Sequence, residues 1–550
     1  MPAPLEKIFV NSEVDRLQGI VLHSPGDAHR NILPEHVEAV LSLQDFLFRH
    51  TRLETESLDS LVLHNAGAPD LGLTLQPGAN LQLTFKTKEG DSGTLNLGES
   101  LEQLFVDNPQ YILFDDIVDG EHAHQEYSRF RKVVKTVAPH TFDLSGLIHD
   151  ALHQLHSDKA AEEEFFSRLE RFCPPEERKN AALSRRYFHE FGSRRFLKLL
   201  LTGRDHQQQY VFHPLPNLIF TRDLAAAAAD TMILCSAAKP SRLREMLLSW
   251  LVFTVHPMFA RMAQRGRMRT IDMLGALQSH PNPKSVTIEG GDILHIGGDT
   301  LLIGVGERTR PEGVIEMASL LWADGHNSPI EQIIMVDILA KRSSMHLDTI
   351  FTLIDQSPGE FEAMVYGPYV QQGGYGSLRA AVLEQSDFKG GRKPAPEDLN
   401  YIRRRSLSQL FLEIKGWRMK PLFCGGRNHK RRRVDEFGWS NPEDVFYGAL
   451  ADELNSKREQ WTDGANLFAL APGVVTTYAR NRHSLQELSA HDFLVVEPDQ
   501  FINNSLYYIQ RASGPGATRV VIPLGGSELS RGRGGQRCMT MPLLRGPSPV

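Results

Sequence analysis

The sequence predicts a mixed α/β protein from three observations. From His213 onward, short apolar segments typical of strands alternate with longer segments of helical periodicity. Near the start, Gly19–His23 (GIVLH) reads as a strand that ends at the turn Ser24–Asp27 (SPGD). Of the 550 residues, 41% are hydrophobic and 23% are charged, a globular composition that excludes a wholly disordered chain, a collagen and a coiled coil.

After the first strand, the pattern changes twice before the alternation begins. Residues 35–66 carry Leu and Phe at mixed spacings of three and four, which predicts a helix. Residues 67–100 are richer in Gly and Thr and include the alternating segment QLTFKT, which predicts a strand. We expect residues 67–100 to be an insertion at the surface.

The next region is predicted to be a strand followed by a charged helical region. Tyr111–Ile117 (YILFDDI) is the second predicted strand. Residues 121–202 have a helical pattern with many charges and a break at Cys173–Pro175. We interpret residues 121–205 as a helical subdomain inserted between strands.

Beyond His213 the elements are predicted by apolar runs and by helical periodicity. The predicted helices are Arg242–Val255, Gly313–Ala323 and His483–Leu488. The predicted strands are Leu218–Phe220, Thr231–Cys235, Ser285–Ile288, Thr300–Gly304, Ile333–Asp337, Ile350–Leu353, Leu467–Ala471, Phe493–Val496 and Val520–Ile522.

Charge and cysteine content limit the function classes. A formal net charge of −7 opposes binding to nucleic acid, so KRRR at 430–433, within a predicted insertion at 427–457, indicates a solvated loop. The most apolar stretch, Met246–Val255, is far shorter than the ~20 residues of a spanning helix and predicts a core helix rather than a membrane contact. The first residues contain no apolar run of signal-peptide length. The four cysteines are scattered, which excludes a disulfide framework and favours a reducing, cytoplasmic compartment: Cys173, Cys235, Cys424 and Cys538.

Two short segments bring carboxylates to the ends of predicted elements. In PNLIFTRD, strand alternation would place Asn217 and Asp223 on one face and Phe220 on the other; a surface Arg–Asp pair is the alternative. In IEGGD, two glycines allow close backbone approach and bring Glu289 and Asp292 to one turn, which an ordinary hairpin would also explain.

Two further segments carry a histidine and a cysteine. In MHLDT, His346 and Asp348 would share a face of a strand, as a general acid/base beside a carboxylate or as a structural pair. Cys538 follows the loop SRGRGGQR, whose positive charge is expected to lower the thiol pKa and favour a nucleophile. A buried core cysteine and an Arg/Gly RNA-binding element are the alternatives.

A cysteine, a histidine and several carboxylates together favour a cationic substrate. Carboxylates would oppose the negative charge that develops in acyl transfer. They suit a guanidinium, which is planar and pairs bidentately with carboxylates. Each charged hydrogen bond contributes roughly 1.5–3 kcal/mol, and two carboxylates would orient the guanidine carbon for attack.

In this order, PNLIFTRD, IEGGD, GERT, MHLDTIFT, REQWTDGAN with APGVV, and SELSRGRGGQRCMTMP resemble arginine deiminases of the guanidino-group-modifying superfamily. VNSEVDRLQGIVLHSPG and Phe114–Ile117 also resemble that family, so the blocks span residues 10 to 545. The resemblance implies a pentein-type α/β propeller of five ββαβ-like modules about a pseudo-fivefold axis, with a helical subdomain inserted. It implies a cytoplasmic homo-oligomer (dimer or tetramer) that hydrolyses free L-arginine to L-citrulline and ammonia without a metal or an organic cofactor.

The resemblance also implies roles for individual residues. Cys538 would attack the guanidinium carbon to give a covalent amidino-thioether, and His346 would be the general acid/base. Asp223 and Asp348 would hold the guanidinium nitrogens, and Glu289 would support His346.

The same resemblance implies a set of substrate-binding residues. Arg242 and Arg308 would bind the α-carboxylate of the substrate, with Arg244 as the alternative to Arg242. The remaining residues would line the pocket or form the mobile loop beside the cysteine: Asn217, Phe220, Gly532 and Arg533.

Three alternatives stay open at this point. The resemblance implies one catalytic domain that spans 1–550, but the chain is longer than a typical arginine deiminase, mainly in two additional insertions at 45–108 and 427–457. The same chemistry would serve an agmatine or methylarginine hydrolase or an amidinotransferase, and a silent scaffold would serve as an arginine sensor. Agmatine has no carboxylate, so the two arginines Arg242 and Arg308 discriminate among these substrates.

Overall fold

The computed structural model divides the chain into two units, Met1–Asn31 with Val118–Val550 and Ile32–Ile117, which are described separately below. The residues that the structure describes are 4–38, 40–42, 52–57, 60–64, 70–74, 82–86, 92–96, 105–107, 111–174, 177–280, 282, 285–323, 327–367, 378–404, 406–426, 442–512 and 516–546.

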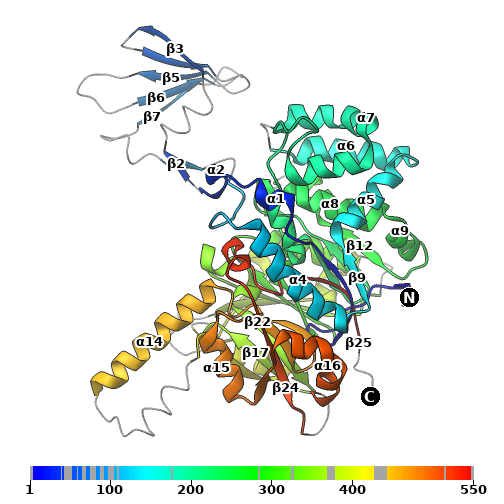
Figure 1. Cartoon of the computed structure of the whole chain (residues 1–550), viewed down its shortest axis with the longest axis vertical. Helices are drawn as coiled ribbons and strands as arrows, with labels where there is room; N and C mark the ends of the chain where they lie inside the picture. The colour runs from blue at the N-terminus through cyan, green and yellow to red at the C-terminus, as the bar shows by residue number, and fades with distance from the viewer. Residues whose placement is uncertain are drawn as a thin grey trace. The chain divides into compact units, whose positions relative to one another are not determined.

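Five sheets of the larger unit share one design (Figure 1). In each, the first strand pairs antiparallel with the second, and the second pairs parallel with the third. They are sheet 1, β25 (Met541–Gly546), β1 (Arg16–Leu22) and β9 (His140–Asp143); sheet 2, β10 (Ala225–Ala228), β11 (Thr231–Leu234) and β12 (Arg269–Asp272); sheet 3, β13 (Ile293–Gly297), β14 (Thr300–Val305) and β15 (Gln332–Asp337); sheet 4, β16 (Phe351–Ser357), β17 (Glu360–Val365) and β20 (Arg418–Phe423); and sheet 5, β21 (Phe468–Ala471), β22 (Val474–Tyr478) and β24 (Arg519–Leu524).

Helices connect the parallel strands, because a parallel pair needs a crossover of a dozen or more residues. Additional strands extend sheet 3, by β18 (Leu378–Glu384) and β19 (Ile402–Arg404), and sheet 5, by β23 (Phe493–Val495). The crossover helices are α1 (Asp27–Arg30) and α4 (Gly120–Val137); α8 (Leu243–Val255) and α9 (Pro257–Gln264); α11 (Pro311–Leu321); α12 (Leu407–Lys415); and α15 (Arg482–Ala490) and α16 (Pro498–Arg511). The sequence therefore folds as the predicted mixed α/β protein.

A layer of helices packs beside sheet 2, where α5, α6, α7 and α8 lie together (Figure 1). Phe165, Phe188 and Phe196 are fully buried between α6 and α7, and aspartates cap α5 and α6 at their N-termini. The predicted break is confirmed, since α6 ends immediately before Cys173. The bounds are α5 (Leu144–Leu155), α6 (Lys159–Phe172) and α7 (Arg178–Thr202), with α10 (Met273–Ser279) following β12.

The most apolar helix, α8, belongs to the core. Leu247, Leu251 and Phe253 are fully buried in it, which confirms the prediction of a core helix. Among the described helices, none is by itself long and apolar enough to span a membrane. The pair Pro240–Val255 and Pro257–Gln264 meets both conditions only when taken together, across a bend of 58°.

The described residues of the smaller unit form two sheets, and strands occupy the range for which a long helix is predicted, residues 35–66. In RLETES, Leu53 and Thr55 alternate with charged residues, and in SLVLH, Leu61 and Leu63 stand two residues apart, so both segments have the period of a strand. The predicted strand in QLTFKT is confirmed. The elements are α2 (Pro34–Val37), the pair β2 (Val40–Ser42) and β8 (Phe105–Asp107), and an antiparallel sheet of β3 (Arg52–Ser57), β4 (Ser60–His64), β5 (Asp70–Thr74), β6 (Gln82–Lys86) and β7 (Ser92–Asn96).

Three predicted strands are wrong. Tyr111–Ile117 is irregular, with Leu113 at φ 68°, and Leu218–Phe220 lies in a 3-10 turn. Ser285–Ile288 makes only the bridge between Ile288 and Ser236. The other seven predicted strands beyond His213 and all three predicted helices are confirmed within two residues, except that β16 continues four residues beyond the predicted Leu353. In the predicted insertion at 427–457, residues 427–441 lie outside the described residues, and α14 (Pro442–Trp461) begins within it.

Candidate active site

The chemically active residues lie just before the first strands of the five sheets. Asp223 precedes β10, Glu289 precedes β13, Asp348 precedes β16, Asn466 precedes β21 and Cys538 precedes β25. All five are buried, and the turn that follows Glu289 contacts both the turn that carries Asp223 and the turn that carries Asp348. Segments far apart in the sequence therefore come together because each one leads into the first strand of an equivalent sheet.

Short 3-10 turns, rather than the predicted strands, carry the first three of these residues. They are η3 (Pro216–Ile219) and η4 (Thr221–Leu224), η7 (Gly290–Asp292) and η9 (Leu347–Thr349). A side chain at Gly290 would collide with the carbonyl of Arg222, and a Cβ at Gly291 would lie 2.7 Å from His346 Nδ1. The two glycines thus let the turns approach closely, as the sequence predicts.

His346 is held by two carboxylates. Its Nε2 lies 2.9 Å from Glu289 Oε2, and its Nδ1 lies 3.6 Å from Asp223 Oδ1. Burial opposes the protonated imidazole, but the charge of Asp223 and the hydrogen bond with Glu289 outweigh it and raise the pKa of His346 to about 10. Burial likewise opposes the Glu289 carboxylate, but His346 and Arg308 lower the pKa of Glu289 to about 2. At neutral pH the imidazole is therefore a charged proton donor.

Asp292, the second carboxylate of the IEGGD segment, positions the backbone beside His346. Its two oxygens accept hydrogen bonds from the Thr309 hydroxyl at 2.6 Å and from the Leu347 N–H at 2.8 Å. Burial raises the pKa of Asp292 to about 7. The carboxyl group thus joins sheet 3 to the turn that carries His346.

Cys538 lies among carboxylates rather than free cations. Its Sγ is 3.7 Å from Asp348 Oδ2. Burial, followed by the charges of Asp348, Asp223 and Asp463, raises the pKa of the thiol well above its ordinary value. The predicted lowering of this pKa by the cationic loop is wrong because the loop's arginines pair with other groups.

Arg537 is one of those paired arginines, and it joins Asp348 to Glu13. Its Nη1 lies 2.7 Å from Asp348 Oδ2, and its Nη2 lies 2.9 Å from Glu13 Oε1. Arg222 Nη1 approaches the same Glu13 oxygen at 3.5 Å. Sequence reasoning missed Glu13 and Arg537, although Glu13 lies in VNSEVDRLQGIVLHSPG and Arg537 in SELSRGRGGQRCMTMP, two segments that resemble the family.

Replacing Glu13 with glutamine is expected to destabilise the protein by about 3–5 kcal/mol, because Arg537 and Arg222 lose a buried counter-charge. Burial opposes the Glu13 carboxylate, but the two arginines lower its pKa to about 2. The stabilisation is therefore present above the unfolded pKa and is lost as pH falls toward about 2. Urea unfolding of both proteins at neutral and acidic pH measures this difference. The exposed Glu6→Gln variant is the control, and equal unfolding midpoints for E13Q and wild type at neutral pH would contradict the assignment.

Two of the three candidate carboxylate-binding arginines are already paired. Arg242 Nη1 lies 2.6 Å from Asp223 Oδ2 and 3.6 Å from Glu289 Oε2, and its Nη2 lies 2.9 Å from Glu245. Arg244 pairs with Glu177 at 2.7 Å, away from these groups. Arg242 thus belongs to the site and Arg244 to the helical layer.

Arg308 differs from these two arginines. It is buried, and within the described part of the chain no hydrogen bond or ion pair to its guanidinium is present; its Nε has no acceptor. Its charge still contributes to lowering the pKa of Glu289. A buried cation without an anionic partner is suited to a ligand carboxylate.

The remaining predicted residues surround the cysteine loop. Phe220 packs against Gly534, where any side chain would collide with its ring. The Asn217 carbonyl accepts a hydrogen bond from Arg242 at 3.4 Å. Gly532 is buried, and Arg533, at φ 63°, donates to the Trp461 carbonyl and lies 4.0 Å from the centre of the Trp461 ring.

One group of ligand atoms has the spacing of a metal site. An oxygen of Asp223, an oxygen of Glu289 and a nitrogen of His346 lie within 4.8 Å of one another. The raised pKa keeps His346 protonated, and Arg242 already lies against both carboxylates. The group is therefore arranged as an ion-pair network rather than as a set of metal ligands.

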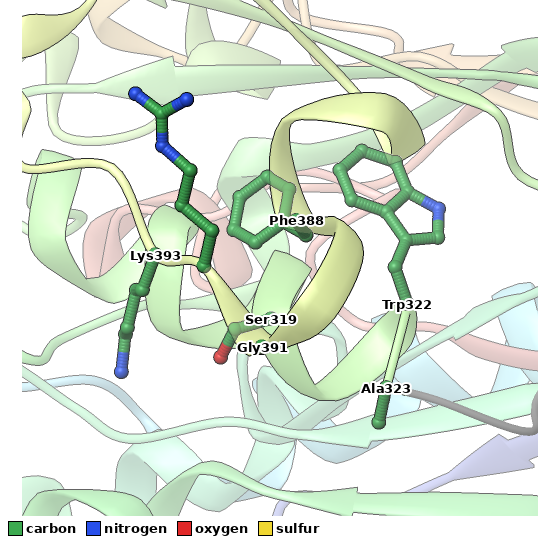
Figure 2. Close-up of a pocket in the computed structure, with 7 residues that line it drawn as sticks. Ser319, Trp322, Ala323, Phe388, Gly391 and Lys393 are labelled. Atoms are coloured by element: carbon green, nitrogen blue, oxygen red, sulfur yellow. The ribbon is translucent and has the colours of Figure 1, made fainter.

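A pocket of about 250 Å³ lies elsewhere, between α11 and the segment after β18 (Figure 2). Trp322 and Phe388 line it, and Lys393 at its rim pairs with Glu316. None of its lining residues belongs to the site around Cys538. The pocket is thus separate from that chemistry.

Sequence reasoning also missed Asn466, whose side chain contacts the cysteine. Its Nδ2 lies 3.2 Å from Cys538 Sγ. The signal was present, because Asn466 stands directly before the apolar strand LFALA, as Asp223 and Cys538 stand before theirs.

Comparison with known proteins gives one family. A family model described as arginine deiminase matches residues 110–375 and 444–545, well over half of the chain. The arginine deiminase of Bacillus cereus (strain B4264) is 28% identical over 467 residues, which cover 82% of this chain and 94% of that protein. The arginine deiminase of Listeria monocytogenes serotype 4b (strain CLIP80459) is 28% identical over 466 residues, covering 82% and 93%.

Two solved structures are more distantly similar. The crystal structure of unliganded AgrE has a TM-score of 0.29 and 13% identity over 60% of this chain, which spans only 31% of AgrE. The product-bound N-terminal domain of ArgZ, a cyanobacterial arginine dihydrolase, has a TM-score of 0.31 and 12% identity, covering 61% of this chain and 78% of that one. At these TM-scores neither structure bears on the fold of this chain.

Proposed function

Because the chain belongs to the arginine deiminase family, we propose that it hydrolyses free L-arginine to L-citrulline and ammonia. The observation that carries the proposal is the burial of one thiol, one protonated imidazole and several carboxylates together. Such a set suits a cation that is attacked at carbon by sulfur. Formation of citrulline from arginine by the purified protein is the direct test.

In the first half of the reaction, the substrate guanidinium lies against Asp223 and Asp348. Asp223 Oδ1 accepts no hydrogen bond within the described residues, so it is available to a guanidinium N–H. The Cys538 thiolate adds to the guanidine carbon and forms a C–S bond. His346 then protonates one amino group, the C–N bond breaks, and ammonia leaves a covalent amidino-thioether.

In the second half, His346 is neutral and takes a proton from water. The resulting hydroxide adds to the carbon of the intermediate. The C–S bond then breaks, the hydroxyl proton of the adduct is lost to solvent where ammonia takes it up, and citrulline leaves as the thiolate is restored. Glu289 holds the imidazole by its hydrogen bond at 2.9 Å and stabilises its charged form in both halves.

The surroundings of Cys538 couple thiolate formation to substrate binding. In the free protein, burial and three carboxylates raise the pKa of the thiol. A guanidinium between Asp348 and Asp223 would cancel their charge at the sulfur. The thiolate therefore forms in the presence of the cation that it attacks.

The substrate carboxylate is assigned to Arg308, because Arg242 already pairs with Asp223 and Glu245. Arg308→Ala is expected to lower kcat/KM for arginine by about 10–150-fold, the cost of one charged hydrogen-bonded pair. Turnover of agmatine, which has no carboxylate, should change much less. Steady-state kinetics on both substrates measure the difference, with the nearby exposed Arg310→Ala variant as control. An equal loss on both substrates would count against this role.

We also infer that the five sheets stand around a pseudo-fivefold axis, as five modules of a propeller. Contacts between sheets 1 and 2, sheets 1 and 5, and sheets 4 and 5 support this order. The bridge between Ser236 and Ile288 connects sheets 2 and 3, and the contact of β14 with η9 connects sheets 3 and 4. The helical subdomain predicted for 121–205 would be only the part that follows β9, because α4 and β9 belong to sheet 1. Residues 45–108 and 427–457 would be additional insertions. Both additional insertions overlap residues that the family model does not match.

The expectation of a cytoplasmic homo-oligomer, dimer or tetramer, remains a proposal drawn from the family. The unbridged state of the four cysteines is consistent with a reducing compartment. Light scattering of the purified protein tests the oligomeric state.

A further inference from the structure

Asn466 completes a pattern that the other sheets establish. Sheets 1 to 4 each place a reacting or charged side chain just before the first strand, and sheet 5 places Asn466 there. The side chain is fully buried, and it is the member of this group that cannot carry a charge. Its position alone suggests that it serves the same site.

Its contacts hold Cys538 at both the backbone and the sulfur. Asn466 Oδ1 accepts from the Cys538 N–H at 3.2 Å, and Nδ2 lies 3.2 Å from Cys538 Sγ. The second Nδ2 hydrogen is donated to the Asp348 carbonyl at 3.0 Å. The Cys538 carbonyl accepts in turn from the Arg222 N–H at 3.0 Å.

This network determines the orientation of the amide. If its oxygen and nitrogen exchanged places, the NH₂ group would face the Cys538 N–H, and the oxygen would face the Asp348 carbonyl. Donor would then meet donor and acceptor would meet acceptor. Asn466 must therefore present an N–H to the sulfur.

The loop before Cys538 is shaped to admit this side chain. A Cβ at Gly535 would lie 2.6 Å from Asn466 Oδ1 and 2.7 Å from its Cβ, so glycine is required there. The neighbouring Gly534 carbonyl accepts a hydrogen bond from the Tyr478 hydroxyl of β22 at 2.8 Å. Residues of sheet 5 and of the segment before it thus contact the loop at two points, Asn466 at Gly535 and Tyr478 at Gly534.

We propose that Asn466 is a catalytic residue that donates a hydrogen bond to the Cys538 thiolate and aims the sulfur at the substrate carbon, an inference that rests on the proposed function. An N–H donor favours the charged form of its partner. The charged and titratable groups around the sulfur are the carboxylates Asp348, Asp223 and Asp463, the cations His346 and Arg537, and the Tyr478 phenol. Among these groups, Asn466 is a neutral donor that stays in place throughout both halves of the reaction.

The test replaces Asn466 with alanine, which removes the donor without adding a charge, and with aspartate, which keeps the shape and the acceptor but puts a negative charge where the donor stood. The alanine variant must show the same direction of shift, because a shift in the aspartate variant alone would follow from its charge. Asn481→Asp is the matched control, since Asn481 is equally buried, also precedes an element associated with sheet 5, and bonds Thr462 instead. Alkylation of Cys538 by iodoacetamide is followed from about pH 6 to about pH 11, because burial and the neighbouring carboxylates raise the pKa of this thiol well above its ordinary value. The tryptic fragment Cys538–Arg545 reports this thiol separately from the other three cysteines.

The alkylation midpoint of N466D is expected to rise by at least about one pH unit, so labelling at neutral pH slows by about tenfold. Its kcat should fall by about 10²-fold, the effect of removing one donor from a reacting atom, with little change in KM. N481D should match wild type in both measurements. An N466D alkylation profile that superimposes on that of wild type overturns the proposal, even if kcat falls.

Two further comparisons distinguish a failure to fold, and a failure of the proposed function, from a failure of the Asn466 proposal. Circular dichroism checks the fold of each variant, and if N466D does not fold, Asn466→Ala decides the question on the same alkylation criterion. Wild type that forms no citrulline would contradict the proposed function. The shift in the thiol titration would still report whether Asn466 acts on the sulfur.

Discussion

Cys538→Ala is expected to abolish citrulline formation, lowering kcat by at least about 10⁴-fold. The sulfur forms the bond to the guanidine carbon, and no other thiol of the chain lies against Asp348 and Asn466 among the described residues. Binding of arginine should persist, because Asp223, Asp348 and Arg308 remain in place. Colorimetric detection of citrulline and calorimetric titration with arginine measure the two quantities.

Cys424→Ala is the matched control for that substitution. Cys424 is buried after β20, where its Sγ contacts Ser484 and not the site, so its removal should leave turnover unchanged. Substantial citrulline formation by the Cys538 variant would contradict the nucleophile assignment. Wild type that binds arginine but releases no citrulline would instead indicate a sensor built on the same scaffold.

His346→Gln is expected to lower kcat by about 10²–10⁴-fold, the usual contribution of a general acid/base. Glutamine can still donate a hydrogen bond to Glu289 but cannot transfer the proton that ammonia needs. Since the pKa of His346 is raised to about 10, the charged form predominates below that pH and is lost above it. The kcat/KM of wild type should therefore fall as pH rises through about 10.

His256→Gln provides the comparison for the histidine substitution. His256 caps α9 through a hydrogen bond to the Met258 N–H and approaches Asp150, so its loss should affect stability rather than turnover. Rates are measured from neutral to alkaline pH for the three proteins. A His346→Gln variant that retains most of the wild-type kcat would contradict the assignment of His346 as acid/base.

Most of the second half of the fold could be predicted because buried strands there are short apolar runs between turns. TLLIGV of β14 is buried throughout and could hardly be read otherwise. The wrong predictions of helices and strands lie where the local hydrophobic pattern was ambiguous. RLETES and SLVLH are strands inside a range whose Leu and Phe residues were interpreted as a helical repeat, and LIF at 218–220 is apolar because it is buried in a turn.

The sequence predicts most of the residues that form the site, but it does not predict their protonation states. The segments that carry Asp223, Glu289, His346 and Cys538 were visible from residue type and spacing. The thiol pKa was not, because the partners of the loop arginines come from distant parts of the chain. Arg537 is neutralised by Glu13, more than five hundred positions earlier in the sequence. Asn466 was missed because an amide carries no charge that marks it as reactive.

Sheet 1 has a consequence for how the protein is made. Its first strand, β25, ends at Gly546 and pairs with β1, which begins at Arg16. A ribosome therefore synthesises β1 before the strands of sheets 2 to 5, and the nucleophile after them. A nascent chain can form sheets 2 to 5 earlier, but it stays inert until Cys538 is made and β25 pairs with β1. Premature termination anywhere before Cys538 thus releases a product without the nucleophile.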